Sequence, residues 1–263
     1  MMRLIKKTLL FTIPLVFSAC IFDSDDEVEP WNAEAVCPAE GTNAYGMPNR
    51  GTFTDERDGE VYKYTTIGNQ VWMTENLRYA APYSTCSEDT SFIRQYCELI
   101  EHNCETESCC RESMCNLFGR YYSIVEKGEW FGSIDIPLTD TICPKGWHIP
   151  TKGEWESLEG AMKASSDNNS DVANRMKSAD SNSFAMSKMH YNKSKRISTG
   201  TDDCGLSFIP SGVMNDGGQT IESGAIFLSS TQKDTSSIYT IIVGNHTEYY
   251  FQNHKNTIRC VMD

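Results

Sequence analysis

The sequence predicts an α+β fold in which antiparallel sheets stand beside one clear amphipathic helix and long disulfide-stapled loops. Short apolar segments alternate with Gly, Asn, Asp and Ser turns from residue 208 onward, and this spacing is typical of antiparallel strands. A β-hairpin is indicated over residues 61–73, where β-branched and aromatic residues flank Gly68-Asn69. A single good helix beside such strands makes the class α+β.

The first 19 residues are typical of a signal peptide. Three basic residues precede an apolar run over residues 8–17, which is too short to span a bilayer. The run ends in Phe17-Ser18-Ala19-Cys20, which resembles the bacterial lipobox, where small residues precede a cysteine that is acylated. We therefore expect export, cleavage before Cys20 and a membrane contact through lipid on Cys20. The alternative is an ordinary secretory signal, with Cys20 in a disulfide.

Residues 20–48 are expected to form an acidic tether ahead of the domain at residues 49–263. Residues 21–29 hold five acidic side chains and no basic one, and such a run is usually a solvated spacer. The run also resembles the acidic signal that sends some lipoproteins of Bacteroidetes and their relatives to the cell surface. We expect an outer-membrane lipoprotein that faces either the medium or the periplasm.

The charge of the chain argues against nucleic acid as a partner. The formal net charge is -13, and removal of residues 1–19, which hold three cations and no anion, would leave -16. Phosphate backbones require a basic face. Roughly 215 residues follow the tether, enough for one domain with a sizeable core.

The cysteines indicate disulfides. The chain has 11, and ten remain if Cys20 is acylated, an even number in an oxidising compartment. Six of them lie close together without the paired Cys-x-x-Cys spacing of a zinc site, which leaves zinc as a minor alternative. They fall in residues 82–118, a polar, weakly periodic stretch that we interpret as an insertion held by disulfides and suited to recognition.

The clearest helix begins at Thr151. Thr151-Lys152-Gly153-Glu154 fits a capping box, and Trp155, Leu158 and Met162 then recur on one face. Residues 163–203 are polar and are expected to be mostly loop, with Phe184, Met186 and Met189 as anchors.

Five strands are expected near the end of the chain. Gly244-Asn245 could close a hairpin between the third and the fourth. The segments are residues 208–210, 225–228, 238–243, 249–251 and 257–262.

Several stretches together resemble the Fibrobacter succinogenes major paralogous domain, a family of exported bacterial proteins expanded in fibre-degrading and gut organisms. They follow the family's order over residues 51–263. They are Gly51-Thr52-Phe53-Thr54-Asp55 with Arg57-Asp58-Gly59, Ile67-Gly68-Asn69-Gln70-Val71-Trp72-Met73 with Glu75-Asn76-Leu77, Phe118-Gly119-Arg120-Tyr121-Tyr122, Cys143-Pro144-Lys145-Gly146-Trp147-His148-Ile149-Pro150 with Glu154-Trp155, and Ile258-Arg259-Cys260-Val261.

The resemblance implies a fold similar to the C-type-lectin-like or formylglycine-generating-enzyme-like domains. It also implies that Cys86 pairs with Cys115, and Cys143 with Cys260. The segment between the first two cysteines is much longer here than in the family, and Phe227-Leu228-Ser229-Ser230 replaces an aromatic Trp-Ser-Ser segment. The remaining pairings stay open for Cys37, Cys97, Cys104, Cys109, Cys110 and Cys204.

No catalytic residue can be assigned from the sequence. The chain contains no His-Glu-x-x-His motif, no Gly-x-Ser-x-Gly elbow and no phosphate loop. Glu154 and Glu156 lie at a helix start, where Glu154 already has a capping role, and His148 is expected to be a packed residue. No cofactor is expected either.

A calcium ion is the one metal that the resemblance to lectins suggests. Calcium takes carboxylate, amide and backbone oxygens on loops, so the candidates are Asp202, Asp203, Asn215 and Asp216. The sugar-binding signatures of C-type lectins are absent, and we favour a turn role for these residues.

Exposed aromatic rings are the alternative way to bind sugar, because they stack on pyranose faces. Trp130 and Phe131, on an expected loop, and Tyr249 and Tyr250, where one ring of a strand should be exposed, are the candidates. Trp72, Trp147 and Trp155 occupy patterned positions and are expected in the core.

These observations favour a non-catalytic, lipid-anchored envelope protein that recognises plant-fibre polysaccharide or a protein partner. The alternatives are a carbohydrate-active or formylglycine-generating-type enzyme and a structural envelope protein without a ligand.

Overall fold

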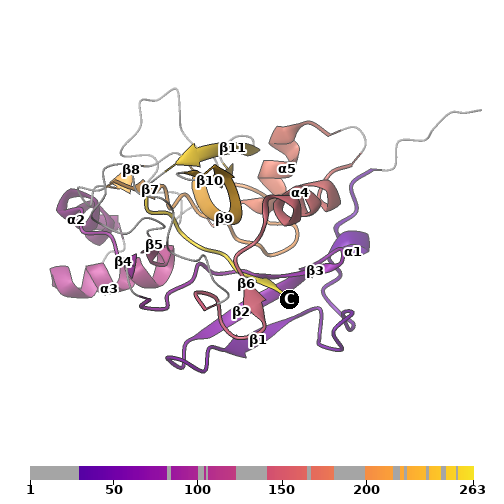
Figure 1. The fold of residues 1–263 in the computed structure, drawn as a ribbon, viewed down its shortest axis with the longest axis horizontal. Coiled ribbons are helices and arrows are strands. Elements are labelled where there is room, and N and C mark those ends of the chain that lie inside the picture. The colour runs from indigo at the N-terminus through magenta and orange to yellow at the C-terminus, as the bar shows by residue number, and fades with distance from the viewer. Residues whose placement is uncertain are drawn as a thin grey trace, which may run out of the picture.

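The computed structural model of the chain describes residues 30–81, 84–99, 104, 106–122, 141–164, 167–180, 199–215, 220–221, 224–234, 237–243, 247–252 and 254–263. Two main sheets form the body of the molecule, and two helices of the cysteine-rich insertion lie at one end of it (Figure 1). The α+β class with antiparallel sheets is therefore confirmed.

The larger sheet has five strands in the order β1-β2-β3-β12-β6. The predicted hairpin is confirmed, because β2 and β3 pair antiparallel around the turn at Gly68, which has a positive φ of 56°. Side chains alternate along β2, and this places Tyr62 and Tyr64 in the interior. The strands are Arg50–Thr54 (β1), Val61–Ile67 (β2), Gln70–Met73 (β3), Trp147–His148 (β6) and Val261–Met262 (β12).

The second sheet has the order β11-β10-β9 and contains Ala225–Asp234 (β9), Ser237–Val243 (β10) and Thr247–Gln252 (β11). Antiparallel pairing of β10 with β11 confirms the expected neighbours. Residues 208–210 were predicted to be a strand, but they do not form one. Phe208 makes only an isolated bridge to Lys177. Two short pairs complete the strands: Ser84–Thr85 (β4) with Tyr121–Tyr122 (β5), and Val213–Met214 (β7) with Thr220–Ile221 (β8).

The helix predicted after Thr151 is confirmed as α4, Lys152–Ala161, with both bonds of the capping box present. The two polar stretches also contain helices that the sequence did not predict. The insertion contains two helices, α2 (Thr90–Leu99) and α3 (Glu107–Phe118), and the polar stretch after α4 contains α5 (Asn169–Met176). A short helix, α1 (Ala33–Val36), precedes the sheets.

The core is built from aromatic rings that link the two sheets to α4. Trp155 packs at a ring-centroid distance of 4.6 Å from Trp72 and 5.4 Å from Phe227. Trp72, Trp147 and Trp155 are all buried, as expected. A separate apolar cluster around Met114 and Phe118 lies under the insertion and gives it a small core of its own.

Five disulfides join the cysteines of the described chain. Cys86 pairs with Cys115 and Cys143 with Cys260, the two pairs that the family resemblance implies. The others are Cys37–Cys204, Cys97–Cys110 and Cys104–Cys109. Three of the five therefore lie inside the insertion.

The packed unit begins before residue 49, where the sequence placed its boundary. Trp31 donates its indole N–H to Asp203 at 2.6 Å and lies over the guanidinium of Arg175, and Cys37 is disulfide-bonded to Cys204. Part of the predicted tether, residues 31–48, is therefore held on the domain. Among the helices that the structure describes, none is long and apolar enough to cross a membrane.

Candidate recognition site

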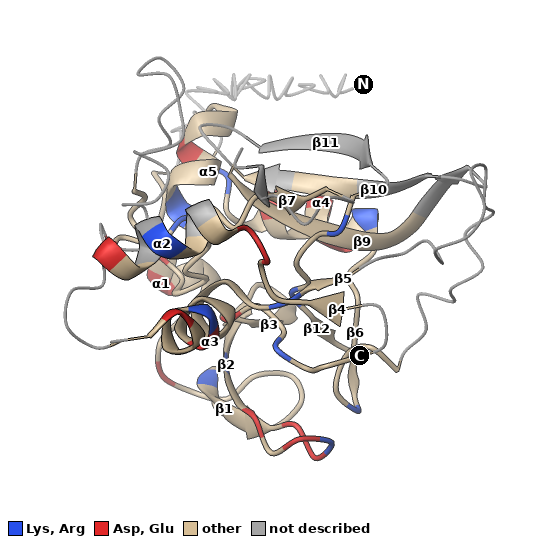
Figure 2. Cartoon of the chain, turned by 90° about the vertical axis from the view of Figure 1, so that its left-hand side faces the viewer, with Lys and Arg blue, Asp and Glu red and all other residues tan. Residues whose placement is uncertain are grey.

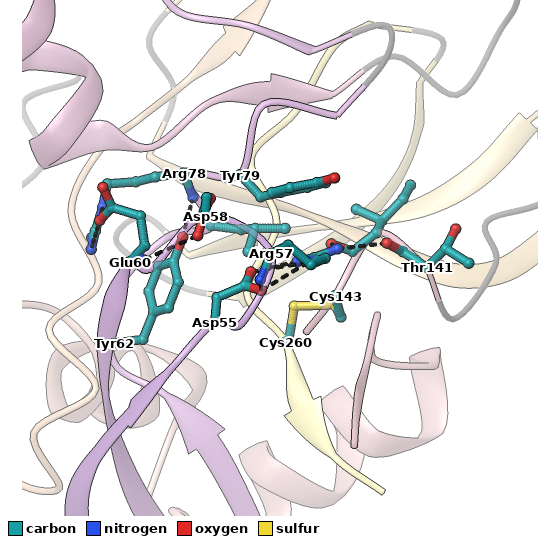
Figure 3. A network of polar contacts seen from close by, with 12 residues as sticks. Asp55, Arg57, Asp58, Glu60, Tyr62, Arg78, Tyr79, Thr141, Cys143 and Cys260 are labelled. Atoms are coloured by element: carbon teal, nitrogen blue, oxygen red, sulfur yellow. Dashed lines mark hydrogen bonds and ion pairs between the residues drawn. A yellow bond between two sulfur atoms is a disulfide. The ribbon is translucent and has the colours of Figure 1, made fainter. Parts of the chain in front are cut away.

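Asp55 and Arg57 of the first family-like motif connect the β1–β2 turn to residues 141–142, next to the Cys143–Cys260 disulfide. Arg57 forms a two-pronged ion pair with Asp55, at 2.9 and 2.6 Å, and donates to the backbone oxygens of Thr141 and Ile142 (Figure 3). Burial raises the pKa of Asp55, but the hydrogen bonds and the charge of Arg57 together lower it by more, so the net shift is downward. Four of the five N–H groups of Arg57 are engaged in this way, so its role is structural.

A second arginine stands beside the first. Arg78 pairs with Glu60 at 2.8 Å, and its guanidinium lies 4.5 Å from the ring centre of Tyr62 (Figure 3). The hydroxyl of Tyr62 accepts the backbone N–H of Arg78, and burial raises the pKa of Tyr62 to about 12. Glu60 and Arg78 also form one wall of a charged cleft that is described below.

Arg259, the arginine of the last family-like motif, is completely buried. It donates to the side-chain oxygen of Asn76 at 3.0 and 2.7 Å and to the backbone oxygen of Leu206 at 2.5 Å. Burial lowers the pKa of Arg259 to about 9, and the guanidinium stays charged at neutral pH. Asn76 and Arg259 thus join two of the family-like motifs across the core.

His148 lies between two carboxylates, Glu154 at 2.8 Å and Asp263 at 2.5 Å. The bond to Glu154 raises the pKa of His148 to about 9, against the effect of partial burial and with help from Asp263. Glu154 also completes the capping box of α4. A charged histidine in two ion pairs holds a strand to a helix and is not poised as a base.

The proposed calcium residues have protein partners where the structure describes them. Asp202 accepts from the backbone N–H and the hydroxyl of Ser207, and Asp203 accepts from Trp31. Asn215 is partly buried, and Asp216 lies outside the described residues. Within the described ranges no group of three or more His, Cys, Asp and Glu side chains could hold a metal.

The other predicted site residues are placed only in part. Cys20, Trp130 and Phe131, together with the anchors Phe184, Met186 and Met189, lie outside the described residues. Tyr249 and Tyr250 belong to β11, opposite Ile241 and Thr240 of β10.

A neutral cleft of about 380 Å³ lies beside α1 and the turn of the β2–β3 hairpin. Three segments that are separate in sequence line it: residues 35–38, residues 42–49 and residues 66–69. Its lining is uncharged and combines apolar side chains with hydroxyl and amide groups, the latter including Thr42, Asn43 and Asn69. Such groups can exchange hydrogen bonds with sugar hydroxyls.

An exposed aromatic ring stands at this cleft. Tyr45 is 46% exposed, and with Val61 at 52% it is one of two exposed large hydrophobic residues in the described chain. The turn that carries Tyr45 is fixed by Asn43, whose side chain accepts the backbone N–H groups of Tyr45 and Met47 and donates to Thr66. Gly46 closes the turn with a positive φ of 76°, a conformation that favours glycine.

Sequence reasoning missed Tyr45 because it placed residues 20–48 in a tether. The signal that could have found it is the run Gly41-Thr42-Asn43-Ala44-Tyr45-Gly46, an aromatic residue in a turn rich in Gly and Asn. The cleft itself depends on the backbone bond from Gly68 to Val36 and on the Cys37–Cys204 disulfide, neither of which the pattern predicts.

The fold and the site define a disulfide-bonded α+β domain in which the motif residues Arg57, His148 and Arg259 are structural. Residues 65–262 match the sequence profile of the Fibrobacter succinogenes major domain, and the chain belongs to this family. The motif at residues 51–59 precedes the matched region. Comparison with curated proteins and with solved structures gave no match, so the C-type-lectin-like analogy stays a prediction.

Proposed function

We propose that the chain is a non-catalytic recognition module of the cell envelope that binds neutral polysaccharide of plant fibre at the Tyr45 cleft. The observation that carries the proposal is Tyr45 itself, an exposed ring on a turn fixed by Asn43. An aromatic residue on a turn that is already fixed stacks on a pyranose ring with little loss of backbone freedom. The absence of charged side chains from the cleft lining favours neutral glycans such as cellulose and xylan.

Export and lipid attachment at Cys20 belong to the same proposal. Five disulfides in the described chain fit an oxidising compartment, and the acidic run after Cys20 fits a solvated spacer. Radiolabelled fatty acid should enter the wild-type chain and not the Cys20→Ser variant. Equal labelling of both would contradict the anchor.

The test of the binding function is retention of the oxidised, detergent-solubilised full chain on insoluble cellulose and xylan. Loss of the stacked ring in Tyr45→Ala should weaken retention at least about tenfold, which corresponds to about 1.4 kcal/mol. Tyr45→Phe keeps the ring and should retain binding. Val61→Ala removes the other exposed apolar side chain, at the far end of β2, and serves as the matched control.

Two outcomes separate the alternatives. Retention that survives Tyr45→Ala and disappears with chelator would move the site to a cation, with Asp202 and Asp203 as the described candidates. No retention of the wild-type chain on any fibre would reject polysaccharide recognition and leave a protein partner in the envelope.

A further inference from the structure

A second cleft, of about 350 Å³, lies where the insertion meets the body of the domain. Helix α3 supplies one wall, the Cys86–Cys115 disulfide lies in the lining, and Glu60 with Arg78 forms the opposite wall. Figure 1 places α3 and α1 at opposite ends of the molecule, so this cleft is separate from the Tyr45 cleft.

The second cleft differs from the first in charge. Its lining holds three guanidinium groups, from Arg78, Arg111 and Arg120, against two carboxylates, from Glu60 and Glu112. Figure 2 shows basic and acidic residues side by side on α3. The lining therefore holds one more cation than anions, in a chain with a net charge of -13.

Arg120 has a charge that the described neighbours do not balance. It donates to the hydroxyl and the backbone oxygen of Ser84, at 3.0 and 3.2 Å, and to the sulfur of Cys86 at 3.4 Å. All three acceptors are neutral. A guanidinium has five N–H donors, so two of them have no acceptor among the described residues.

The other two arginines differ in how firmly they are held. Arg78 is paired with Glu60 and is only 12% exposed, whereas Arg111 is 39% exposed and makes a longer contact of 3.4 Å with Glu107 on its own helix. An exposed pair of this kind contributes little and is easily exchanged for another carboxylate. Arg111 and Arg120 are therefore the two groups able to take a ligand.

We propose that this cleft binds the carboxylate of a uronic acid unit in an acidic polysaccharide. Planar guanidinium groups pair with carboxylates through two parallel hydrogen bonds. The same lining offers the hydroxyl of Ser108 and the amide of Asn116, which match sugar hydroxyls. The volume suits one or two sugar rings, whereas a protein partner requires a wider contact surface.

The experiment measures binding of the oxidised full chain to polygalacturonate at low salt. Arg120→Gln should weaken binding at least tenfold and Arg111→Gln severalfold, while Lys145→Gln, which removes an exposed cation outside the cleft, should change nothing. Raising the salt should weaken binding, because salt screens partly exposed charges. Fully methyl-esterified polymer should not bind.

Three results would overturn the proposal: no binding of polygalacturonate, binding unchanged in both arginine variants, or equally tight binding of polyglutamate. The Arg111 variant keeps the test valid if Arg120→Gln fails to fold, since Arg111 lies on an exposed helix face. Tyr45→Ala should lose cellulose and keep polygalacturonate, so failure here and failure of the neutral-glycan proposal give different patterns.

Discussion

Arg259 places a full charge in the core without a carboxylate in direct contact. Its acceptors are the amide oxygen of Asn76 and backbone oxygens, and its guanidinium lies 4.8 Å from the ring centre of Phe208. The charge is therefore solvated by oriented dipoles and a ring face instead of water. A motif residue that is buried in this way has no access to a substrate.

Asn76→Leu should destabilise the fold more than Arg259→Met does. Loss of Asn76 leaves a buried charge without its main acceptor, which costs about 3–5 kcal/mol. Arg259→Met removes the charge as well and leaves only neutral oxygens unsatisfied, which costs about 2 kcal/mol. Urea unfolding of the oxidised chain measures both free energies, and the reverse order would contradict the assigned contacts.

His148 should make stability depend on pH in the alkaline range. Its pKa is raised to about 9 in the folded chain, so the stabilisation is fully present below about pH 6.5 and is lost as the pH rises through 9. The expected loss is about 1 kcal/mol, because partial exposure screens the pairs. The pKa of Glu154 is lowered, and its contribution is lost as the pH falls below its ordinary range. Unfolding free energies of wild type and His148→Gln should converge at pH 10; a constant difference would contradict the ion pairs.

Among the helices and strands, those whose ends are fixed by short-range hydrogen bonds were predicted correctly from the sequence. The hairpin turn at Gly68 and the capping box at Thr151 use short-range hydrogen bonds, and both formed as expected. Helix α3 was not predicted because Cys110 was considered only as a disulfide cysteine and not as part of an apolar helix face. In the structure Cys110, Met114 and Phe118 form one buried face at helical spacing.

Helix α5 was missed for a different reason. Its start is fixed by Asn168 and Asp171, which form a capping box from residues other than the usual Ser, Thr and Glu. Only Val172, Ala173 and Met176 are buried, so the apolar stripe is too short to stand out in a polar stretch. Tertiary contact, including the bond from Phe208 to Met176, completes the helix.

The Cys86–Cys115 disulfide should be required for the acidic-ligand cleft and dispensable for the neutral one. Replacing both cysteines with serine frees a loop of 29 residues, at a cost of about 3 kcal/mol to the insertion. Polygalacturonate binding should be lost, because the lining of that cleft includes the bridge, while cellulose retention should persist. Binding of polygalacturonate at wild-type affinity would show that the insertion is held by other contacts.

For the whole molecule, the class and the family were predictable and the clefts were not. Strand spacing and ordered motifs were sufficient for the first two. Each cleft combines segments that are far apart in sequence: residues 35–38 meet residues 66–69 in one, and Glu60 meets Arg120 in the other. Such meetings depend on disulfide pairing and on packing, and sequence spacing alone leaves both open.

The two long-range disulfides also decide how the molecule would respond to mechanical load. The bridges Cys37–Cys204 and Cys143–Cys260 are connected to each other by three separate segments of chain. These are residues 37–143, 143–204 and 204–260. When force is applied between Cys37 and Cys260, the shortest segment, of about 56 residues, limits the distance between them to about 200 Å. Without the two disulfides the extended chain between them would reach about 800 Å. Single-molecule stretching before and after reduction should show this difference.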